Sequence, residues 1–228
     1  MLELYALNIN EPIEKQKYEE FYSLISSEKK DRINKFHFID DRKRSLYGDL
    51  LIRQLITKKL GVMNDKISFG VTDYGKPYLI NDKNFHYNIS HSKDWVFCGI
   101  SDYKIGVDIE HIKVCDFDLA ERFFAKEEYE FLKMALDEEC DKLFFDIWCM
   151  KESYIKYKGL GLAIPLDSFR CERKTPFLYL VKNNNELLNI RNYHIDNTYS
   201  AAVCSPYYLI EPVNYITLQQ IYNNAFMG

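Results

Sequence analysis

Two carboxylates lie side by side in a short apolar segment. The residues IGVDIE at 105–110 alternate strictly, which is typical of a β-strand, so the aliphatic residues face one side and Gly106, Asp108 and Glu110 face the other. Neighbours on one face of a strand are roughly 6–7 Å apart, and two carboxylates that close disfavour each other's ionisation unless a cation neutralises them. Two interpretations follow: the solvated face of an edge strand, or a metal site.

A second segment, WCMKESYIKYKGLGL at 148–162, has the period of an amphipathic helix. Lys151 and Glu152 lie within about 60° of the centre of its apolar stripe, and Lys156 lies just outside it. A charge on an apolar face needs a partner or a ligand. Because Glu152 and Lys156 are four residues apart, they also fit an ordinary surface ion pair.

Three other segments contain residues that could bind phosphate. NISHS at 88–92 ends a predicted strand, and YGKP at 74–77 is a turn. The run at 28–45 has seven Lys and Arg against four Asp and Glu, by count in the sequence. Each also has a purely structural interpretation, as a satisfied histidine, a plain turn and a solvated helix face.

Together these residue types are complementary. The three carboxylates Asp108, Glu110 and Glu152 suit a hard cation such as Mg²⁺. Such an ion shares its coordination with substrate phosphates, and their charge requires Lys and Arg nearby. The sequence therefore outlines a metal-dependent phosphoryl-transfer site.

The elements that must position these residues form two halves. Helical periodicity covers 12–25, 41–60, 118–124, 127–136 and 141–158, with Gly61 and Gly159 as stops, and short strands lie between the helices. Each half contains helices and a small, mostly antiparallel sheet, with a crossover near 103–105. The sequence therefore predicts an α+β fold.

Composition excludes several classes of protein. The 228 residues carry a net charge of −4 with a pI near 5.8, which argues against general nucleic-acid binding. We see no basic and apolar leader and no apolar run long enough for a membrane span. The six cysteines show no metal-binding spacing, so we expect reduced thiols and a cytoplasmic protein.

The ordered motifs resemble those of a known family. GVDIE, then FFAKEEYEFL at 123–132, then WCMKESYIKYKGLGL are similar to the motifs of the 4′-phosphopantetheinyl transferases. NISHS, YGKP and the chain length place the resemblance with the larger, surfactin-synthetase-associated (Sfp-type) members. It implies two similar α/β subdomains with pseudo-two-fold symmetry and the active site in the cleft between them. We place the N-terminal, coenzyme A-binding subdomain at 1–103 and the C-terminal, metal-binding and catalytic subdomain at 104–228.

The resemblance also implies roles for single residues. Asp108, Glu110 and Glu152 match the metal-binding acidic residues, and Glu152, Lys156 and Asp108 are the expected catalytic residues. Lys156 matches the lysine that neutralises the pyrophosphate, with Lys151 assisting. The remaining expected coenzyme A contacts, on phosphates and adenine, are Lys29, Arg32, Arg44, Ser45, Tyr74, Gly75, Lys76, Ser90 and His91. Three positions depart from the family pattern, namely Arg32 for lysine, Ser45 for threonine, and Ala125 where a helix-capping Ser or Thr is usual.

The implied reaction moves the phosphopantetheine arm of coenzyme A to a serine of an apo acyl or peptidyl carrier protein. It needs Mg²⁺ and releases adenosine 3′,5′-bisphosphate, and a monomer is expected. Residues after the metal strand are candidates for carrier docking, although the apolar ones equally fit the core: Ile112, Lys113, Val114, Phe117, Arg122 and Phe123. Two alternatives stay open, an inactive module that binds coenzyme A or a carrier protein, and a Mg²⁺-dependent nuclease.

Overall fold

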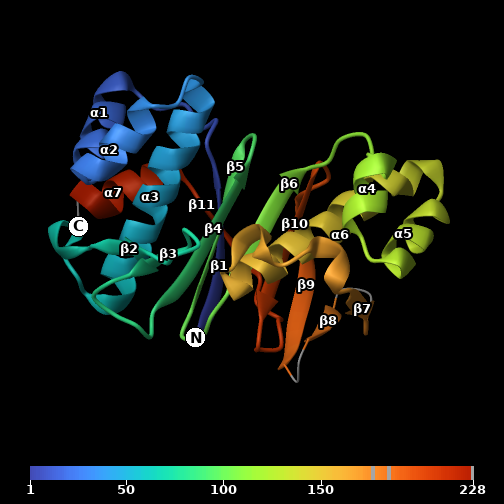
Figure 1. The fold of residues 1–228 in the computed structure, drawn as a ribbon. Helices are drawn as coiled ribbons and strands as arrows, with labels where there is room; N and C mark the ends of the chain where they lie inside the picture. The colour runs from blue at the N-terminus through green and yellow to red at the C-terminus, as the bar shows by residue number, and fades with distance from the viewer. Residues whose placement is uncertain (176–177, 184–185, 227–228) are drawn as a thin grey trace.

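Two sheets stand beside each other and each is covered by helices, as Figure 1 shows for a computed structural model of the chain. The structure describes residues 1–175, 178–183 and 186–226. The predicted α+β class is confirmed. The helices are α1 (Lys15–Ser23), α2 (Ser27–Asn34), α3 (Ile39–Leu60), α4 (Phe117–Phe123), α5 (Lys126–Lys133), α6 (Asp137–Lys158) and α7 (Leu218–Phe226), with 3₁₀ turns η1 (Asn64–Lys66), η2 (Gly161–Ala163) and η3 (Leu166–Ser168).

The first sheet, called here the N-terminal sheet, has the strand order β11-β1-β5-β4. Its strands are β1 (Leu2–Asn8), β4 (His86–Ser92), β5 (Trp95–Ser101) and β11 (Val213–Ile216), and a small hairpin of β2 (Phe69–Val71) and β3 (Pro77–Leu79) lies outside it. Helix α3 packs on one face around Leu46, Leu51 and Ile56, which are buried together with strand residues such as Val96.

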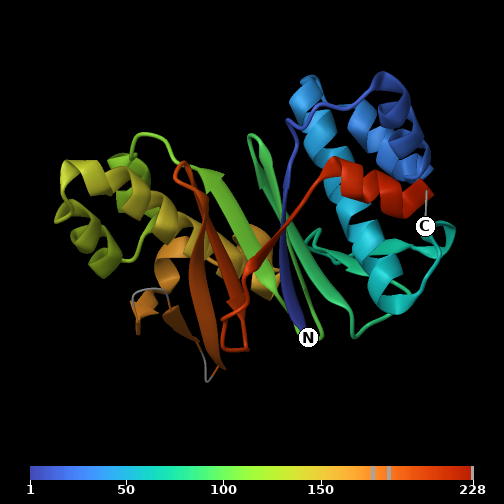
Figure 2. The same ribbon diagram turned by 180° about the vertical axis from the view of Figure 1, so that it is seen from behind.

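The last elements of the chain return to this N-terminal sheet. Strand β11 pairs with β1 in parallel, with Leu4 opposite Val213, and α7 packs against α3. Figure 2, which views the molecule from behind, shows the chain crossing toward the viewer's side of the sheets to reach this position. Sequence patterns missed β11 and grouped residues 213–226 with the C-terminal half, because the partner of a strand four residues long lies more than 200 positions away. The predicted boundary after residue 103 stays a prediction.

The second sheet, called here the C-terminal sheet, is antiparallel with the order β6-β10-β9-β8-β7. Its strands are β6 (Gly106–His111), β7 (Cys171–Arg173), β8 (Leu178–Asn183), β9 (Glu186–Asp196) and β10 (Tyr199–Ser205). Helix α6 crosses β6 and β10 and buries Phe144, Ile147 and Tyr154. Among the described residues, no helix is both long and apolar enough to cross a membrane.

A third apolar core lies between the two sheets. It contains Leu4 and Phe97 from the N-terminal sheet and Val107, Ile109 and Val203 from the C-terminal sheet. These residues are fully buried. The predicted alternation of residues 105–110 is confirmed, because its aliphatic face fills this core and leaves Asp108 and Glu110 on the opposite face.

The two longest helices end in the same way. Both α3 and α6 have 22 residues, and the glycine after each, Gly61 and Gly159, adopts φ values of 66° and 69°. Glycine reaches this left-handed conformation without the strain of a Cβ atom, so both predicted stops are confirmed. Helix α6 begins at Asp137, before the predicted start at residue 141. Its N-cap residue is the apolar Leu136, which has no capping side chain, so the sequence pattern does not mark this start.

Lys151 is a structural residue. Its side chain is 1% exposed, and its ammonium contacts Glu128 Oε2 at 2.6 Å and the carbonyl oxygens of Leu166 and Phe169 at 2.8 and 2.7 Å. Glu128 in turn accepts hydrogen bonds from the backbone N–H groups of Ala125 and Cys171. The Glu128 carboxylate therefore accepts the backbone hydrogen bond at the start of α5, where Ala125 has no side-chain oxygen. The Lys151–Glu128 ion pair joins α5, α6 and η3. In this conformation the Lys151 ammonium is held by these partners, and its predicted assistance at the phosphates stays a prediction.

We expect Lys151→Met to destabilise the protein by about 3–5 kcal/mol, because it leaves the buried carboxylate of Glu128 without its cation. Urea denaturation followed by circular dichroism measures the change. Lys133→Met is the matched control, since it removes a lysine from the exposed ion pair with Glu130 and should leave the midpoint unchanged. Equal midpoints for both variants would contradict the structural role of Lys151.

Candidate active site

Helix α6 lies directly on strand β6 at Gly106. A Cβ atom at this position would come within 2.0 Å of the Ser153 carbonyl oxygen and 2.3 Å of the Tyr157 amide nitrogen. Only glycine permits such a close approach of two backbones. The next residues on the same face of β6, Asp108 and Glu110, therefore lie under α6, which carries Glu152 and Lys156.

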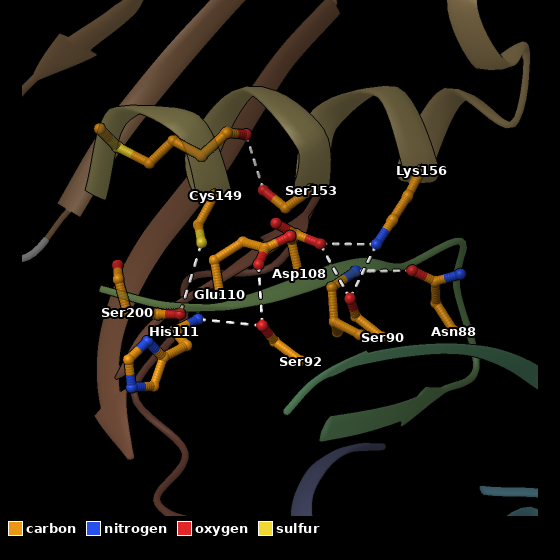
Figure 3. Close-up of polar contacts among 12 residues, drawn as sticks. Asn88, Ser90, Ser92, Asp108, Glu110, His111, Cys149, Ser153, Lys156 and Ser200 are labelled. Atoms are coloured by element: carbon orange, nitrogen blue, oxygen red, sulfur yellow. Dashed lines mark hydrogen bonds and ion pairs between the residues drawn. The ribbon is translucent and has the colours of Figure 1, made fainter. Parts of the chain in front are cut away.

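Strand β4 runs along the other side of β6 and presents every second side chain to it. Asn88 Oδ1 accepts a hydrogen bond from the Val107 N–H at 2.8 Å. Ser90 donates to Asp108 at 2.9 Å, and Ser92 donates to Glu110 at 2.8 Å (Figure 3). The segment NISHS thus aligns three polar residues with the acidic strand.

Asp108, Ser90 and Lys156 form the centre of the site. The Lys156 ammonium lies 2.6 Å from Asp108 Oδ1 and 2.9 Å from Ser90 Oγ (Figure 3). Asp108 is 2% exposed, whereas the Lys156 side chain is 29% exposed. Burial alone lowers the pKa of Lys156, but the charges of Asp108 and Glu152 outweigh it and the pKa is raised. Lys156 is therefore a fixed positive charge on this face.

The carboxylates repel one another. Burial raises the pKa of Glu110 and of Glu152, and the charge of Asp108 raises both further. Within the described chain, Asp108 Oδ2 is buried and has no hydrogen-bond partner. A buried carboxylate oxygen without a partner is costly, and a cation would satisfy it.

These carboxylates are of the type that binds metal ions, but in this structure they are not arranged around a single ion position. Three carboxylates are the hard oxygen ligands that Mg²⁺ prefers, and the unsatisfied oxygen of Asp108 lies among them. In residues 1–175, 178–183 and 186–226, however, no three His, Cys, Asp or Glu side chains are placed to hold one ion. The ammonium of Lys156 contacts Asp108 instead.

Sequence reasoning missed three neighbours of these carboxylates. Asn88 and Ser92 share the period-2 face of Ser90, so alternation within NISHS is the signal that identifies them. Cys149 lies on the inner face of α6 and donates to the Ser200 carbonyl oxygen at 3.4 Å. Burial and the nearby charges of Asp108 and Glu110 raise the pKa of this thiol well above its usual value. It is therefore protonated and unreactive.

The predicted coenzyme contacts Arg44, Ser45 and His91 lie where α3 meets β4. Arg44 donates to the Lys93 carbonyl oxygen and to Asp41, both at 2.6 Å. Desolvation, and next the charge of Arg44, lower the pKa of His91, which is exposed on β4. Ser45 is buried on α3. Arg44 and His91 thus lie near each other, as expected for a shared anionic ligand.

The predicted phosphate contacts on α2, Lys29 and Arg32, lie in another cluster. Lys29 is 3.7 Å from Asp49, which also accepts a hydrogen bond from Arg53 at 2.6 Å. Burial lowers the pKa of Lys29, and the charges of Arg32 and Arg53 act in the same direction. Arg32 is exposed. Lys29 and Arg53 thus share the carboxylate of Asp49, and Arg32 lies near enough for its charge to lower the pKa of Lys29.

The turn at 74–77 is ordered by its own backbone. Gly75 has φ 82°, which favours glycine, and its N–H donates to the Thr72 carbonyl oxygen at 2.8 Å. Tyr74 is 58% exposed and free to meet a ligand. The Lys76 ammonium points elsewhere and donates to backbone carbonyls near the end of α6. Its predicted contact with coenzyme A is therefore not made by the side chain in this conformation.

Comparison with known proteins gives one answer along most of the chain. Residues 11–101 match the family model described as 4′-phosphopantetheinyl transferase, N-terminal, and residues 104–204 match that of the 4′-phosphopantetheinyl transferase superfamily. The 4′-phosphopantetheinyl transferase Sfp of Bacillus subtilis is 36% identical over 207 residues, covering 90% of this chain and 92% of that protein. The 4′-phosphopantetheinyl transferase gsp of Aneurinibacillus migulanus is 33% identical over 220 residues, covering 96% and 92%. The chain therefore belongs to the 4′-phosphopantetheinyl transferase superfamily, as an Sfp-type member.

Proposed function

We propose that this transferase moves the phosphopantetheine arm of coenzyme A to a serine hydroxyl of an apo carrier protein, with Mg²⁺ as the metal. The contact that carries the proposal is the one between Lys156 and the buried Asp108, beside Ser90 and under Glu152. It joins a fixed cation to a cluster of carboxylates, which is the arrangement that phosphoryl transfer needs. We propose a monomeric, cytoplasmic protein that acts on neither nucleic acid nor membranes.

Glu152 is the proposed base. In the reaction the serine oxygen forms a bond to the phosphorus next to the pantetheine, and its proton passes to the Glu152 carboxylate. The bond from that phosphorus to the bridging oxygen breaks, and the electron pair leaves with adenosine 3′,5′-bisphosphate. In the protein without metal, burial and the charge of Asp108 raise the pKa of Glu152 above that of an exposed glutamate.

Lys156 is proposed to bind the pyrophosphate and to neutralise the departing bisphosphate, with Ser90 as a hydrogen-bonding neighbour. Asp108, Glu110 and Glu152 would hold Mg²⁺, which when bound supplies positive charge to the phosphate oxygens. Lys29, Arg32, Arg44, Ser45 and His91 are proposed phosphate contacts, and Tyr74 and Gly75 are proposed to hold the adenine.

The carrier protein is proposed to dock on the segment that follows β6. Val114, Phe117 and Phe123 are exposed apolar residues there, with Val114 84% exposed, and Lys113 and Arg122 are exposed bases between them. Exposed Asp116, Asp118 and Glu121 lie in the same segment, so apolar contact rather than net positive charge is proposed to hold the carrier protein. Ile112, the other predicted contact, is only half-buried and extends this patch toward β6.

The reaction itself is tested by intact-mass spectrometry. Apo acyl and peptidyl carrier proteins are incubated with this protein, coenzyme A and Mg²⁺, with EDTA in parallel. We expect a magnesium-dependent gain of one phosphopantetheine, and the faster carrier indicates the pathway served. Binding of coenzyme A without transfer to either carrier would favour an inactive binding module, and cleavage of DNA or RNA would favour a nuclease.

Asp108→Ala should reduce transfer by at least about 100-fold, because it removes a proposed metal ligand and the partner of Lys156. Initial rates from the same mass assay measure the loss, and circular dichroism confirms that the variant is folded. Asp65→Asn removes an exposed aspartate away from the site and should transfer normally. Transfer by Asp108→Ala near the rate of the unmutated protein would refute the metal assignment.

Stability should depend on pH through Glu152. Its pKa is raised above the ordinary value of 4.5, so this group contributes stability below pH 4.5 that is lost as the pH rises through the folded-state pKa. Glu152→Gln cannot ionise. Without metal, we therefore expect its stability relative to the unmutated protein to be greater at pH 8 than at pH 4.5, as measured by urea denaturation in EDTA.

Exposed Glu139 provides the matched control, since Glu139→Gln should give no such pH dependence. Adding Mg²⁺ at pH 8 should stabilise the unmutated protein more than Glu152→Gln, because a carboxylate ligand is missing in the variant. An equal gain for both proteins would mean that Glu152 does not bind the metal.

A further inference from the structure

Lys76 joins three segments that are far apart in the sequence. Its ammonium donates to the carbonyl oxygens of Lys156 and Tyr157 on the last turn of α6, the second at 3.4 Å. It also donates to the Ile105 carbonyl oxygen at 3.0 Å, in the crossover that enters β6. A lysine of the β2–β3 hairpin thus holds the end of one element of the site and the beginning of another.

The end of α6 needs such a donor. The last four carbonyls of an α-helix have no partner within the helix, so they accept from donors outside it. At the end of α6 the Gly159 N–H donates to the carbonyl of Ile155, at 2.8 Å. An ammonium at this position is also favoured by the negative end of the helix dipole. Lys76 therefore caps α6 from outside the helix.

The hairpin presents Lys76 in a fixed position. The Thr72 N–H donates to the Lys76 carbonyl oxygen at 2.9 Å, and Thr72 Oγ1 accepts from the Lys76 N–H at 3.1 Å. The stem of Lys76 lies across Gly159, where an added Cβ would come within 3.0 Å of Lys76 Cδ. Both ends of this side chain are therefore held.

We propose that Lys76 is a positioning residue, which fixes the backbone of Lys156 and the start of β6 so that Lys156 meets Asp108. The expected effect of Lys76 on catalysis rests on the proposed function. Its effect on the backbone positions rests on the contacts described above. The positioning role differs from the role expected from the sequence, in which Lys76 belongs to the turn that holds the adenine end of coenzyme A. The two roles predict different results for substitution of Lys76: positioning affects kcat, whereas a direct contact affects KM for coenzyme A.

Lys76→Met keeps the length of the stem and removes the charge and all donors. Hydrogen–deuterium exchange of the full chain without ligands should become about tenfold faster in peptides covering 102–107 and 154–161, because local opening of these segments is no longer opposed. Lys104→Met is the matched control. Lys104 is an exposed lysine that, together with Lys76, lines a cavity of about 230 Å³. This variant should leave exchange unchanged.

Kinetics separate positioning from binding. Because a small displacement of a catalytic group slows the chemical step, we expect kcat of Lys76→Met to fall about tenfold while KM for coenzyme A changes less than about twofold. Unchanged exchange together with a raised KM would overturn the proposal in favour of direct contact with coenzyme A. Faster exchange with an unchanged kcat would overturn the positioning role.

Two further arms keep the test decisive. If Lys76→Met does not fold, Lys76→Arg is used, which retains the charge and the donors. It should preserve most of the protection from hydrogen exchange at 154–161. Full loss of this protection in a folded Lys76→Arg would overturn the proposal. The exchange measurement needs no substrate. An unmutated protein that transfers nothing would therefore refute the proposed function, and the exchange result would still decide the structural role of Lys76.

Discussion

The contact of two backbones at Gly106 is the constraint on which this site depends. With no side chain at that position, α6 packs so closely on β6 that an added Cβ would lie 2.0 Å from the Ser153 carbonyl oxygen. Any Cβ would push the helix away from the strand and increase the separation between the carboxylates of β6 and the charged residues of α6. The Lys156–Asp108 contact and the burial of Asp108 both follow from this approach.

Bringing two carboxylates of β6 together with one of α6 has an electrostatic cost that the rest of the site offsets in part. Ser90 and Ser92 donate to two of them, and Lys156 supplies a charge, yet the pKa values of Glu110 and Glu152 stay raised. The unsatisfied oxygen of Asp108 marks where compensation is incomplete among the described residues. A site with remaining negative charge is suited to attract a cation, and with it a phosphate.

The sequence predicts those features that depend on local periodicity. The alternation at 105–110 correctly separates a buried aliphatic face from an acidic face, and glycine stops correctly end α3 and α6. Residue type alone could not place the lysines. Lys76, Lys151 and Lys156 all fit phosphate binding by charge, but only the packing of distant segments decides which ammonium meets a carbonyl, a buried glutamate or Asp108. The same limit applies to β11, whose partner β1 is distant in sequence.

The pairing of β11 with β1 also bears on how the chain is made. Strand β1 is synthesised more than 200 residues before the parallel neighbour at its edge, which consists of residues 213–216. On the ribosome the N-terminal sheet therefore lacks its outer strand, and α3 lacks the cover of α7, until residues 213–226 have emerged. Contacts of such long sequence separation slow folding, and an incomplete sheet exposes an edge that other chains can pair with. The N-terminal sheet is thus completed long after its strand β1 has been synthesised.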